Sequence, residues 1–183
     1  MFEIADARRE SRGVHGLALA QLAVSLDASL TSASLPMLVA ALGVSFQAVQ
    51  RMVLAYLVAI TLSAVWSGRA GDRWGRRRLL VSALAIFALT SLLCAAAPTA
   101  AWLTVARTGQ GAAAGTLLAM TVALAGARAG GSATGTAGPA MARLAALSSV
   151  GTTLGPAVAG ALAHAGRAAI FLASVPVAMA AWA

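Results

Sequence analysis

The sequence predicts an all-α membrane protein made of several transmembrane helices. Apolar residues make up 60% of the 183 residues and charged residues only 10%, whereas soluble domains have about 45–50% apolar and about 25% charged residues. The apolar residues fall in long runs that are separated by short segments carrying arginines. Because lipid offers no hydrogen-bond partner to a free backbone amide, we expect each run to form a helix.

The first apolar run covers residues 16–42 and contains Asp27 and several serines. It follows a polar stretch, 1–15, which we expect to be a separate N-terminal segment in the cytoplasm. A secretory signal peptide would have an apolar core of only about 7–15 residues. Because this run is longer and further runs follow it, we interpret it as the first span of a membrane domain that covers residues 16–183.

Spans two to five are predicted at residues 49–67, 79–97, 100–125 and 144–163. Each is close to the ~20 residues that cross a hydrocarbon core of ~30 Å. A sixth run begins at residue 168 and continues to the last residue, 183. At a helical rise of ~1.5 Å per residue it is about 24 Å long. We therefore expect a sixth helix that the end of the chain leaves incomplete.

The distribution of arginines predicts a cytoplasmic N-terminus, because cytoplasmic loops carry an excess of basic residues. With this orientation the outer segments hold only Arg51 and Arg167. A linker at 128–140, rich in Gly, Ser and Thr, would join spans four and five on the cytoplasmic side. The arginines of the cytoplasmic segments are then Arg8, Arg9, Arg12, Arg69, Arg73, Arg76, Arg77, Arg78, Arg128 and Arg143.

Other function classes find little support in the composition. The net charge of +8 does not indicate nucleic-acid binding, because the arginines fall between long apolar runs and do not gather on one amphipathic face. Cys94 is the single cysteine, which excludes an intrachain disulfide and a cysteine metal site. The sequence shows no nucleophile–base pair and no metal-spaced set of His, Cys and carboxylate residues. We therefore expect neither an enzyme nor a bound metal or cofactor.

One acid, Asp72, stands among the arginines between spans two and three, with Gly68 before it and Gly75 after it. A charged turn that fixes topology accounts for the arginines but not for this acid. The segment resembles the G-x-x-x-D-R-x-G-R-R signature loop of the major facilitator superfamily. The resemblance implies a charge network that locks the two halves of a transporter in one state. The conformational-switch residues it implies are Gly68, Asp72, Arg73, Gly75, Arg76 and Arg77.

Arg107 lies several residues inside span four. An arginine at mid-span costs ~2.5–3.5 kcal/mol on insertion, unless its side chain snorkels to an interface. The segment from Leu103 to Gly111 has the pattern L-x-x-x-R-x-x-Q-G, which resembles the second signature of the same superfamily. The resemblance implies a role in proton transfer for Arg107. A fixed cation of this kind favours the ionised form of a neighbouring carboxylate.

Asp27 is the candidate carboxylate, because it is the only acid within a predicted span. Its helix face includes Thr31 and Ser34, and we expect this polar stripe to line a water-filled pathway. Residues 26–36 resemble the L-D-x-T-[IV]-[VL]-N-x-A-L-P signature of the fourteen-span drug:proton antiporters, with departures at Ser29 and Ser32. The resemblance implies proton coupling or cation recognition by Asp27, and a structural, hydrogen-bonded acid is the alternative.

Span five carries small residues that share one helix face, namely Gly151, Gly155 and Ala159. Small residues at this spacing let another helix approach closely, and Pro156 favours a kink. An ordinary packing seam explains this pattern. The segment also resembles the G-x-x-x-G-P-x-x-G-G signature that marks antiporters within the superfamily. Gly151, Gly155, Pro156 and Gly160 match it, and Ala159 replaces one glycine.

The resemblance extends from residue 16 to the end, including the opening of span six at 166–176. It implies the N-terminal six-helix half of a fold in which two such halves, each of 3+3 inverted repeats, surround a central pathway. We expect a multi-pass cell-membrane protein that exports drugs or other amphipathic or cationic compounds by alternating access. Protons would be the coupling ion and the missing C-terminal half a partner. The alternatives are a nutrient or metabolite symporter or uniporter of the superfamily, and a truncated fragment that transports nothing.

Overall fold

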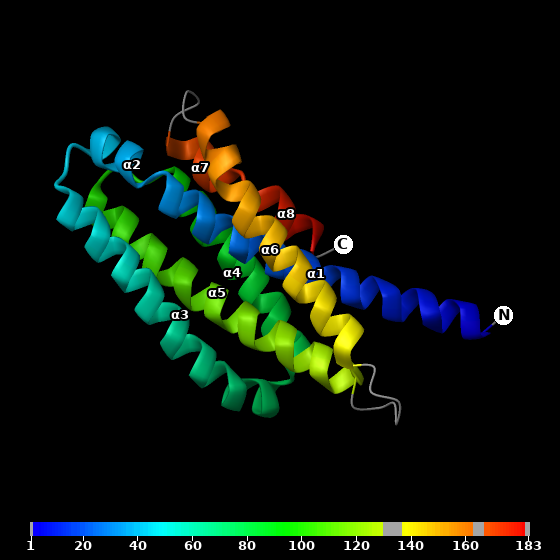
Figure 1. The fold of residues 1–183 in the computed structure, drawn as a ribbon. Helices are drawn as coiled ribbons and strands as arrows, with labels where there is room; N and C mark the ends of the chain where they lie inside the picture. Colours follow the sequence, from blue (N-terminus) through cyan, green and yellow to red (C-terminus); the bar gives the residue numbers. More distant parts are fainter. Residues whose placement is uncertain (1, 130–136, 163–166, 182–183) are drawn as a thin grey trace.

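The computed structural model describes the backbone of residues 2–129, 137–162 and 167–181, and the side chains of residues 16–127, 141–162 and 168–181. Every regular element in these ranges is an α-helix, which confirms the predicted all-α class (Figure 1). Most of the predicted 128–140 linker and the side chains of Arg8, Arg9, Arg12, Arg128 and Arg167 lie outside the described part. The helices are α1 (Phe2–Ala33), α2 (Leu35–Leu42), α3 (Phe46–Trp74), α4 (Arg76–Ala95), α5 (Ala100–Ala129), α6 (Ala137–Leu162), α7 (Arg167–Leu172) and α8 (Val175–Ala180).

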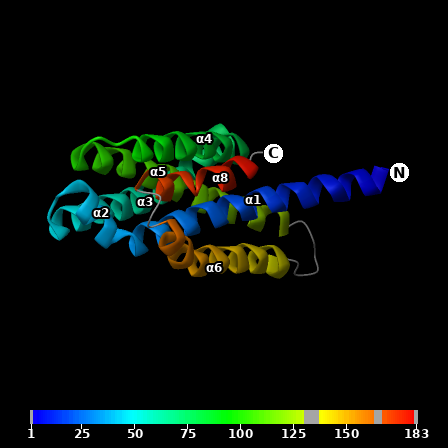
Figure 2. The same cartoon turned by 90° about the horizontal axis from the view of Figure 1, so that it is seen from above.

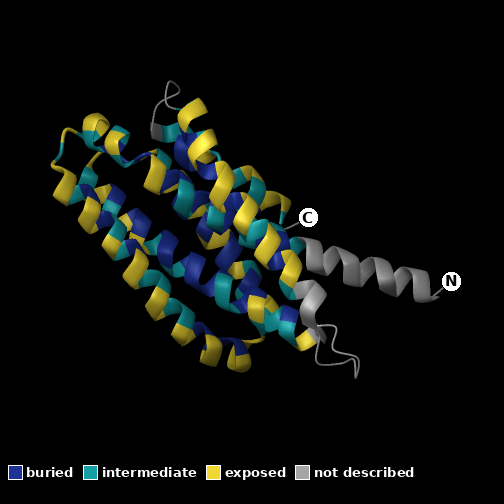
Figure 3. Cartoon of the chain, in the orientation of Figure 1, coloured by how far each residue is buried: buried dark blue, intermediate teal, exposed yellow. Residues whose placement is uncertain are grey.

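Five of these helices, α1, α3, α4, α5 and α6, are long and apolar enough to cross a membrane, and they correspond to the five predicted spans. Their outer faces carry large apolar side chains: Leu62, Val65 and Val105 are 67%, 66% and 74% exposed. Figure 3 shows such exposed residues along the outside of the bundle and buried ones between the helices. An extensive apolar exterior of this kind fits lipid rather than water. The chain is a multi-pass membrane protein.

The first predicted span, at 16–42, is two helices rather than one. α1 ends at Ala33, and the short α2 begins at Leu35 with Pro36 in its first turn. Proline has no backbone N–H to donate, and its ring clashes with the carbonyl of the preceding turn, so an internal proline kinks or breaks a helix. Gly43 then caps α2 with a left-handed φ of 61°.

The predicted sixth span is divided in the same way. α7 ends at Leu172 and α8 begins at Val175, with Pro176 in its first turn. A serine immediately precedes the second helix at both breaks, Ser34 before α2 and Ser174 before α8. Both serines are buried, so the two breaks lie inside the bundle.

Residues 68–78 form almost no loop, which corrects the prediction of one. α3 continues to Trp74 and α4 begins at Arg76, so Gly75 alone turns the chain. Gly75 has φ 91° and ψ 123°, a conformation that glycine adopts without steric cost.

The helices pack most closely as three pairs: α3 with α5, α1 with α6, and α4 with α5. Glycines allow two of these approaches. A Cβ atom at Gly111 would lie 2.5 Å from the carbonyl oxygen of Tyr56, and one at Gly151 would lie 3.0 Å from the carbonyl oxygen of Leu22. Figure 2 shows α1 between α6 on one side and α8 on the other. α1 and α5 therefore form the interior of the bundle, where about half of their residues are buried.

Candidate functional site

The two charged residues predicted inside the membrane form an ion pair. Arg107 on α5 donates through Nη1 to the Oδ2 atom of Asp27 on α1, at 2.8 Å. The Arg107 and Asp27 side chains are only 2% and 1% exposed. Burial at this depth excludes snorkelling to an interface as the explanation for Arg107. The helices that carry the pair are the most buried spans of the bundle.

Neutral polar side chains complete the hydrogen bonds of this pair. Gln110 donates through Nε2 to Asp27 Oδ1 at 3.0 Å, and its Oε1 accepts from Arg107 Nη1 at 2.7 Å. Arg107 Nη2 donates to Thr31 Oγ1 at 2.7 Å, and Gln110 Nε2 also donates to Ser91 Oγ at 2.7 Å. A longer bond of 3.4 Å runs from Ser174 Oγ to Asp27 Oδ1. The buried cluster therefore consists of Asp27, Thr31, Ser91, Arg107, Gln110 and Ser174.

Two aromatic rings and a thiol surround the buried cluster. The Cζ atom of Arg107 lies 4.3 Å from the ring centroid of Tyr56 and 5.5 Å from that of Phe171. A desolvated cation–π contact contributes about 2 kcal/mol. Among the residues that the structure describes, the buried Tyr56 hydroxyl has no hydrogen-bond partner, which costs about 1–3 kcal/mol. The Sγ atom of Cys94 lies 3.5 Å from Gln110 Oε1.

A buried ion pair depends on both of its charges. Removing one partner typically costs about 3–5 kcal/mol, because the remaining charge is left without compensation in a medium of low dielectric. Ionisable residues inside a membrane domain are rare and mark ion or substrate pathways. Any event that neutralises Asp27, such as proton binding, would leave the Arg107 cation among neutral acceptors only. The arrangement can thus convert a change in protonation into a change in packing.

A cavity of about 550 Å³ opens beside the buried cluster. It is bounded by α1, α3, α5 and α6, and among the described residues none that lines it carries a formal charge. Thr31 and Ser34 are not among the residues that line it, and they are 2% and 4% exposed; their place on a transport pathway stays a prediction. They turn instead toward the neighbouring helices, as Asp27 does. The lining residues are Gln21, Val24, Ser25, Ala28, Ser29, Ser32, Tyr56, Ile60, Leu118, Ser148 and Thr152.

The polar residues of α1 that line the cavity are not among the predicted site residues, although their spacing in the sequence gives a signal. Gln21, Ser25, Ser29 and Ser32 recur every three or four residues along the first apolar run, which places them on one helix face. This face lies on nearly the opposite side of the helix from Asp27, and the sequence does not say which of the two is covered by neighbouring helices.

The small-residue face of α6 packs against α1, as its spacing predicts. Gly151 and Gly155 are buried, and a Cβ atom at Gly155 would collide with the side chain of Ser29. Ser29 Oγ donates to the backbone oxygen of Thr152 at 2.7 Å. Pro156 lies inside α6 on its exposed side. The close α1–α6 seam therefore forms one wall of the cavity.

Gly160 belongs to the same signature but lies elsewhere. A Cβ atom there would meet nothing within 4 Å, so Gly160 does not take part in the α1–α6 seam within the described residues.

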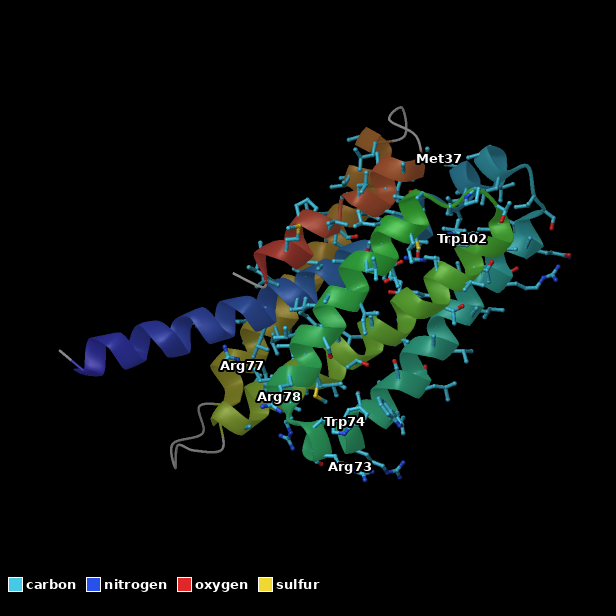
Figure 4. The ribbon with its side chains drawn as sticks, turned by 180° about the vertical axis from the view of Figure 1, so that it is seen from behind. Met37, Arg73, Trp74, Arg77, Arg78 and Trp102 are labelled. Atoms are coloured by element: carbon cyan, nitrogen blue, oxygen red, sulfur yellow. The ribbon has the colours of Figure 1, made fainter. Side chains whose placement is uncertain are left out.

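The signature segment around Asp72 lies at one end of the bundle, away from the buried cluster. Figure 4 shows Arg73 at the end of α3 and Arg77 at the start of α4, opposite the end that carries Trp102. Arg76 Nη2 lies 2.9 Å from Asp72 Oδ1, with the two side chains 41% and 67% exposed. An exposed pair of this kind contributes only about 0–1 kcal/mol. The structure therefore brings Asp27 and Arg107 together but does not join them to the Asp72 segment.

Comparison with known protein families identifies the chain. The family model described as Major Facilitator Superfamily matches residues 17–183. The chain belongs to the Major Facilitator Superfamily. The buried cluster, the cavity and the Asp72 segment are thus features of a member of this superfamily.

Curated relatives of this superfamily member include proteins named for export and resistance. The cephamycin export protein CmcT of Amycolatopsis lactamdurans is 38% identical over 98 residues, which cover 54% of this chain and 20% of that protein. The puromycin resistance protein pur8 of Streptomyces alboniger has the same identity and coverage. The putative multidrug resistance protein MdtD of Cronobacter sakazakii is 32% identical over 87 residues, or 48% of this chain and 18% of that protein. The chain spans about a fifth of the length of these relatives.

Proposed function

We propose that this chain supplies the N-terminal helices of a proton-coupled antiporter that exports drugs or other amphipathic compounds across the cell membrane. The relatives named for export and multidrug resistance support the direction of transport and the substrate class. The cavity has no charged residue among its described lining, and both polar side chains and the apolar Val24, Ile60 and Leu118 line it. Such a cavity suits a compound with both polar and apolar parts. The N-terminus would lie in the cytoplasm, as the arginine distribution indicates.

The buried Asp27–Arg107 pair is the observation that carries this proposal. When a proton binds one oxygen of Asp27, the carboxylate becomes neutral and the 2.8 Å bond from Arg107 loses its ionic character. The Arg107 cation then favours a conformation in which water or another acceptor reaches it. Loss of the proton restores the pair and the original packing. Proton binding and release would in this way alternate between two states of the bundle.

The C-terminal half of the protein would be the partner that closes the cavity. The cavity lies on the side of α1, α3, α5 and α6 and is open in this chain, and the relatives are about five times as long as the matched segment. Alternating access requires a second half against which the first can rock. The exposed Asp72 and the arginines beside it would then pair across the two halves in one of the two states.

The test is Asp27→Asn in the complete transporter, with Arg51→Gln as a control that neutralises an exposed charge. The probe is puromycin, and its accumulation in everted vesicles is driven by an imposed pH gradient. We expect Asp27→Asn to abolish the gradient-driven component and to retain exchange of labelled for unlabelled puromycin, which needs no net proton movement. Undiminished gradient-driven transport by Asp27→Asn would show that Asp27 does not couple proton movement to transport. Movement of proton and drug in the same direction would favour the symporter alternative.

A further inference from the structure

Tyr56 of α3 lies between the buried cluster and the cavity. It is one of the residues that line the cavity, whereas Asp27, Arg107 and Gln110 are not. On its other side the Tyr56 ring faces a charge: the Cζ atom of Arg107 lies 4.3 Å from the centroid of the ring. The side chain is 3% exposed. A single ring thus separates the charges from the space that a compound and water would enter.

The ring holds this position because α3 and α5 approach closely at Gly111. A Cβ atom at Gly111 would lie 2.5 Å from the Tyr56 carbonyl oxygen and 3.1 Å from the Cδ2 atom of its ring. Any larger residue at position 111 would push the ring away from Arg107, which lies one turn earlier on the same helix. The position of the Tyr56 ring between Arg107 and the cavity therefore depends on Gly111 at the close α3–α5 contact.

Two opposing interactions act on the Tyr56 side chain. The cation–π contact with Arg107 holds the ring over the buried cluster. The hydroxyl has no hydrogen-bond partner in this position, whereas the cavity contains the amide of Gln21 and the hydroxyl of Ser25. Since these contributions are of the same order, a modest shift of Arg107 would free the ring to turn toward the cavity.

We propose that Tyr56 is the movable partition that controls proton access from the cavity to Asp27, which rests on the proposed function of the Asp27–Arg107 pair. When the ring turns aside, a proton from cavity water binds a carboxylate oxygen of Asp27, and the hydrogen bond from Arg107 Nη1 is released. Arg107 then no longer holds the ring, so the opening persists until the proton leaves. Tyr56 is a positioning residue: it exchanges no proton itself.

The first experiment measures passive proton entry into proteoliposomes that contain the complete transporter and no drug. Tyr56→Leu removes the ring, and we expect the leak to rise about thirtyfold, the factor that corresponds to loss of one desolvated cation–π contact of about 2 kcal/mol from the barrier. Tyr56→Phe keeps the ring and the contact but removes the hydroxyl that favours opening, so the leak should be at or below the wild-type value. Adding Asp27→Asn to Tyr56→Leu should remove the extra leak. A leak that is equal in Tyr56→Leu and Tyr56→Phe would overturn the proposal.

The second experiment uses Cys94, which lies 3.5 Å from Gln110 in the buried cluster, as a reporter that needs no transport. Any cysteine outside this chain is first replaced. A small water-soluble methanethiosulfonate reagent should modify Cys94 at least severalfold faster in Tyr56→Leu than in wild type. Phe87→Leu is the matched control, because Phe87 is fully buried but does not line the cavity, and it should leave the rate unchanged.

The two experiments separate failure of the partition from failure of proton coupling. Unchanged modification of Cys94 in Tyr56→Leu, or an equal increase in Phe87→Leu, overturns the role of Tyr56 whatever Asp27 does. Faster modification of Cys94 in Tyr56→Leu but not in Phe87→Leu supports the role of Tyr56 as the partition. If Asp27→Asn then shows undiminished gradient-driven efflux, only the proposed role of Asp27 in proton coupling is wrong.

Discussion

The carboxylate of Asp27 and the guanidinium of Arg107 meet at 2.8 Å in the interior of the bundle, although the two residues belong to different helices. Neither charge reaches the surface, since both side chains are at most 2% exposed. Gln110 bonds to both members of the pair. The energy of the pair is therefore expected to depend on both charges together, and this dependence can be measured.

Arg107→Gln should destabilise the complete transporter by about 3–5 kcal/mol, because it leaves the Asp27 carboxylate buried without a counter-charge. Asp27→Asn combined with Arg107→Gln should recover much of that loss, since no lone charge remains. The measurement is thermal unfolding in detergent of the wild type, both single variants and the double variant. Additive losses would show that the two side chains do not interact energetically.

Gly155→Ala should destabilise the α1–α6 seam by about 1–3 kcal/mol, because the new methyl group would collide with Ser29 and overpack the contact. Gly160→Ala is the matched control in the same helix. No atom of the described residues lies within 4 Å of the place that its new methyl group would take, so the stability of this variant should be unchanged or slightly higher. Equal destabilisation by the two variants would contradict the packing described for α6.

Gly75→Ala should cost about 1–3 kcal/mol, because a residue with a Cβ atom is strained at the observed φ of 91°. Gly68→Ala, in the helical part of the same segment, should stabilise α3 by about 0.5–1 kcal/mol. Both free energies can be read from denaturation in detergent. A stabilising Gly75→Ala would mean that the turn between α3 and α4 is not the one observed.

Asp72→Asn should change stability by less than about 1 kcal/mol, because its ion pair with Arg76 is exposed to solvent. If Asp72 also pairs across the two halves of the transporter, drug efflux should fall far more than stability. Parallel measurements of unfolding and of efflux rate separate the two effects. A large loss of stability without a loss of efflux would contradict the proposed switch role.

The sequence was sufficient to predict the elements that follow from local composition. The five long spans follow from the lengths of apolar runs, and the small face of Gly151 and Gly155 follows from their spacing. Asp27 and Arg107 were selected because a charge in lipid is costly, and the structure places them in contact. Pro36 and Pro176 are also a sequence signal for the two helix breaks. The prediction followed the lengths of the apolar runs instead, and each run was interpreted as one helix.

The remaining features depend on how the helices face one another. Ser91, Ser174 and Tyr56 are ordinary residues from separate parts of the chain, and nothing in their spacing shows that they meet around the Asp27–Arg107 pair. For the same reason, the spacing of Thr31 does not show that it bonds to Arg107. A polar stripe can line a cavity or bind a buried charge, and only the position of the neighbouring helices decides between them.

The central claim, that Asp27 carries the coupled proton, is tested most directly by proton release from the purified complete transporter. Drug is added to detergent-solubilised protein in weakly buffered solution at a pH where the carboxylic acid form is populated, and the change in pH is recorded. The account predicts that drug binding releases a proton from the wild type and from Arg51→Gln, and none from Asp27→Asn. Equal proton release by the wild type and Asp27→Asn would contradict it.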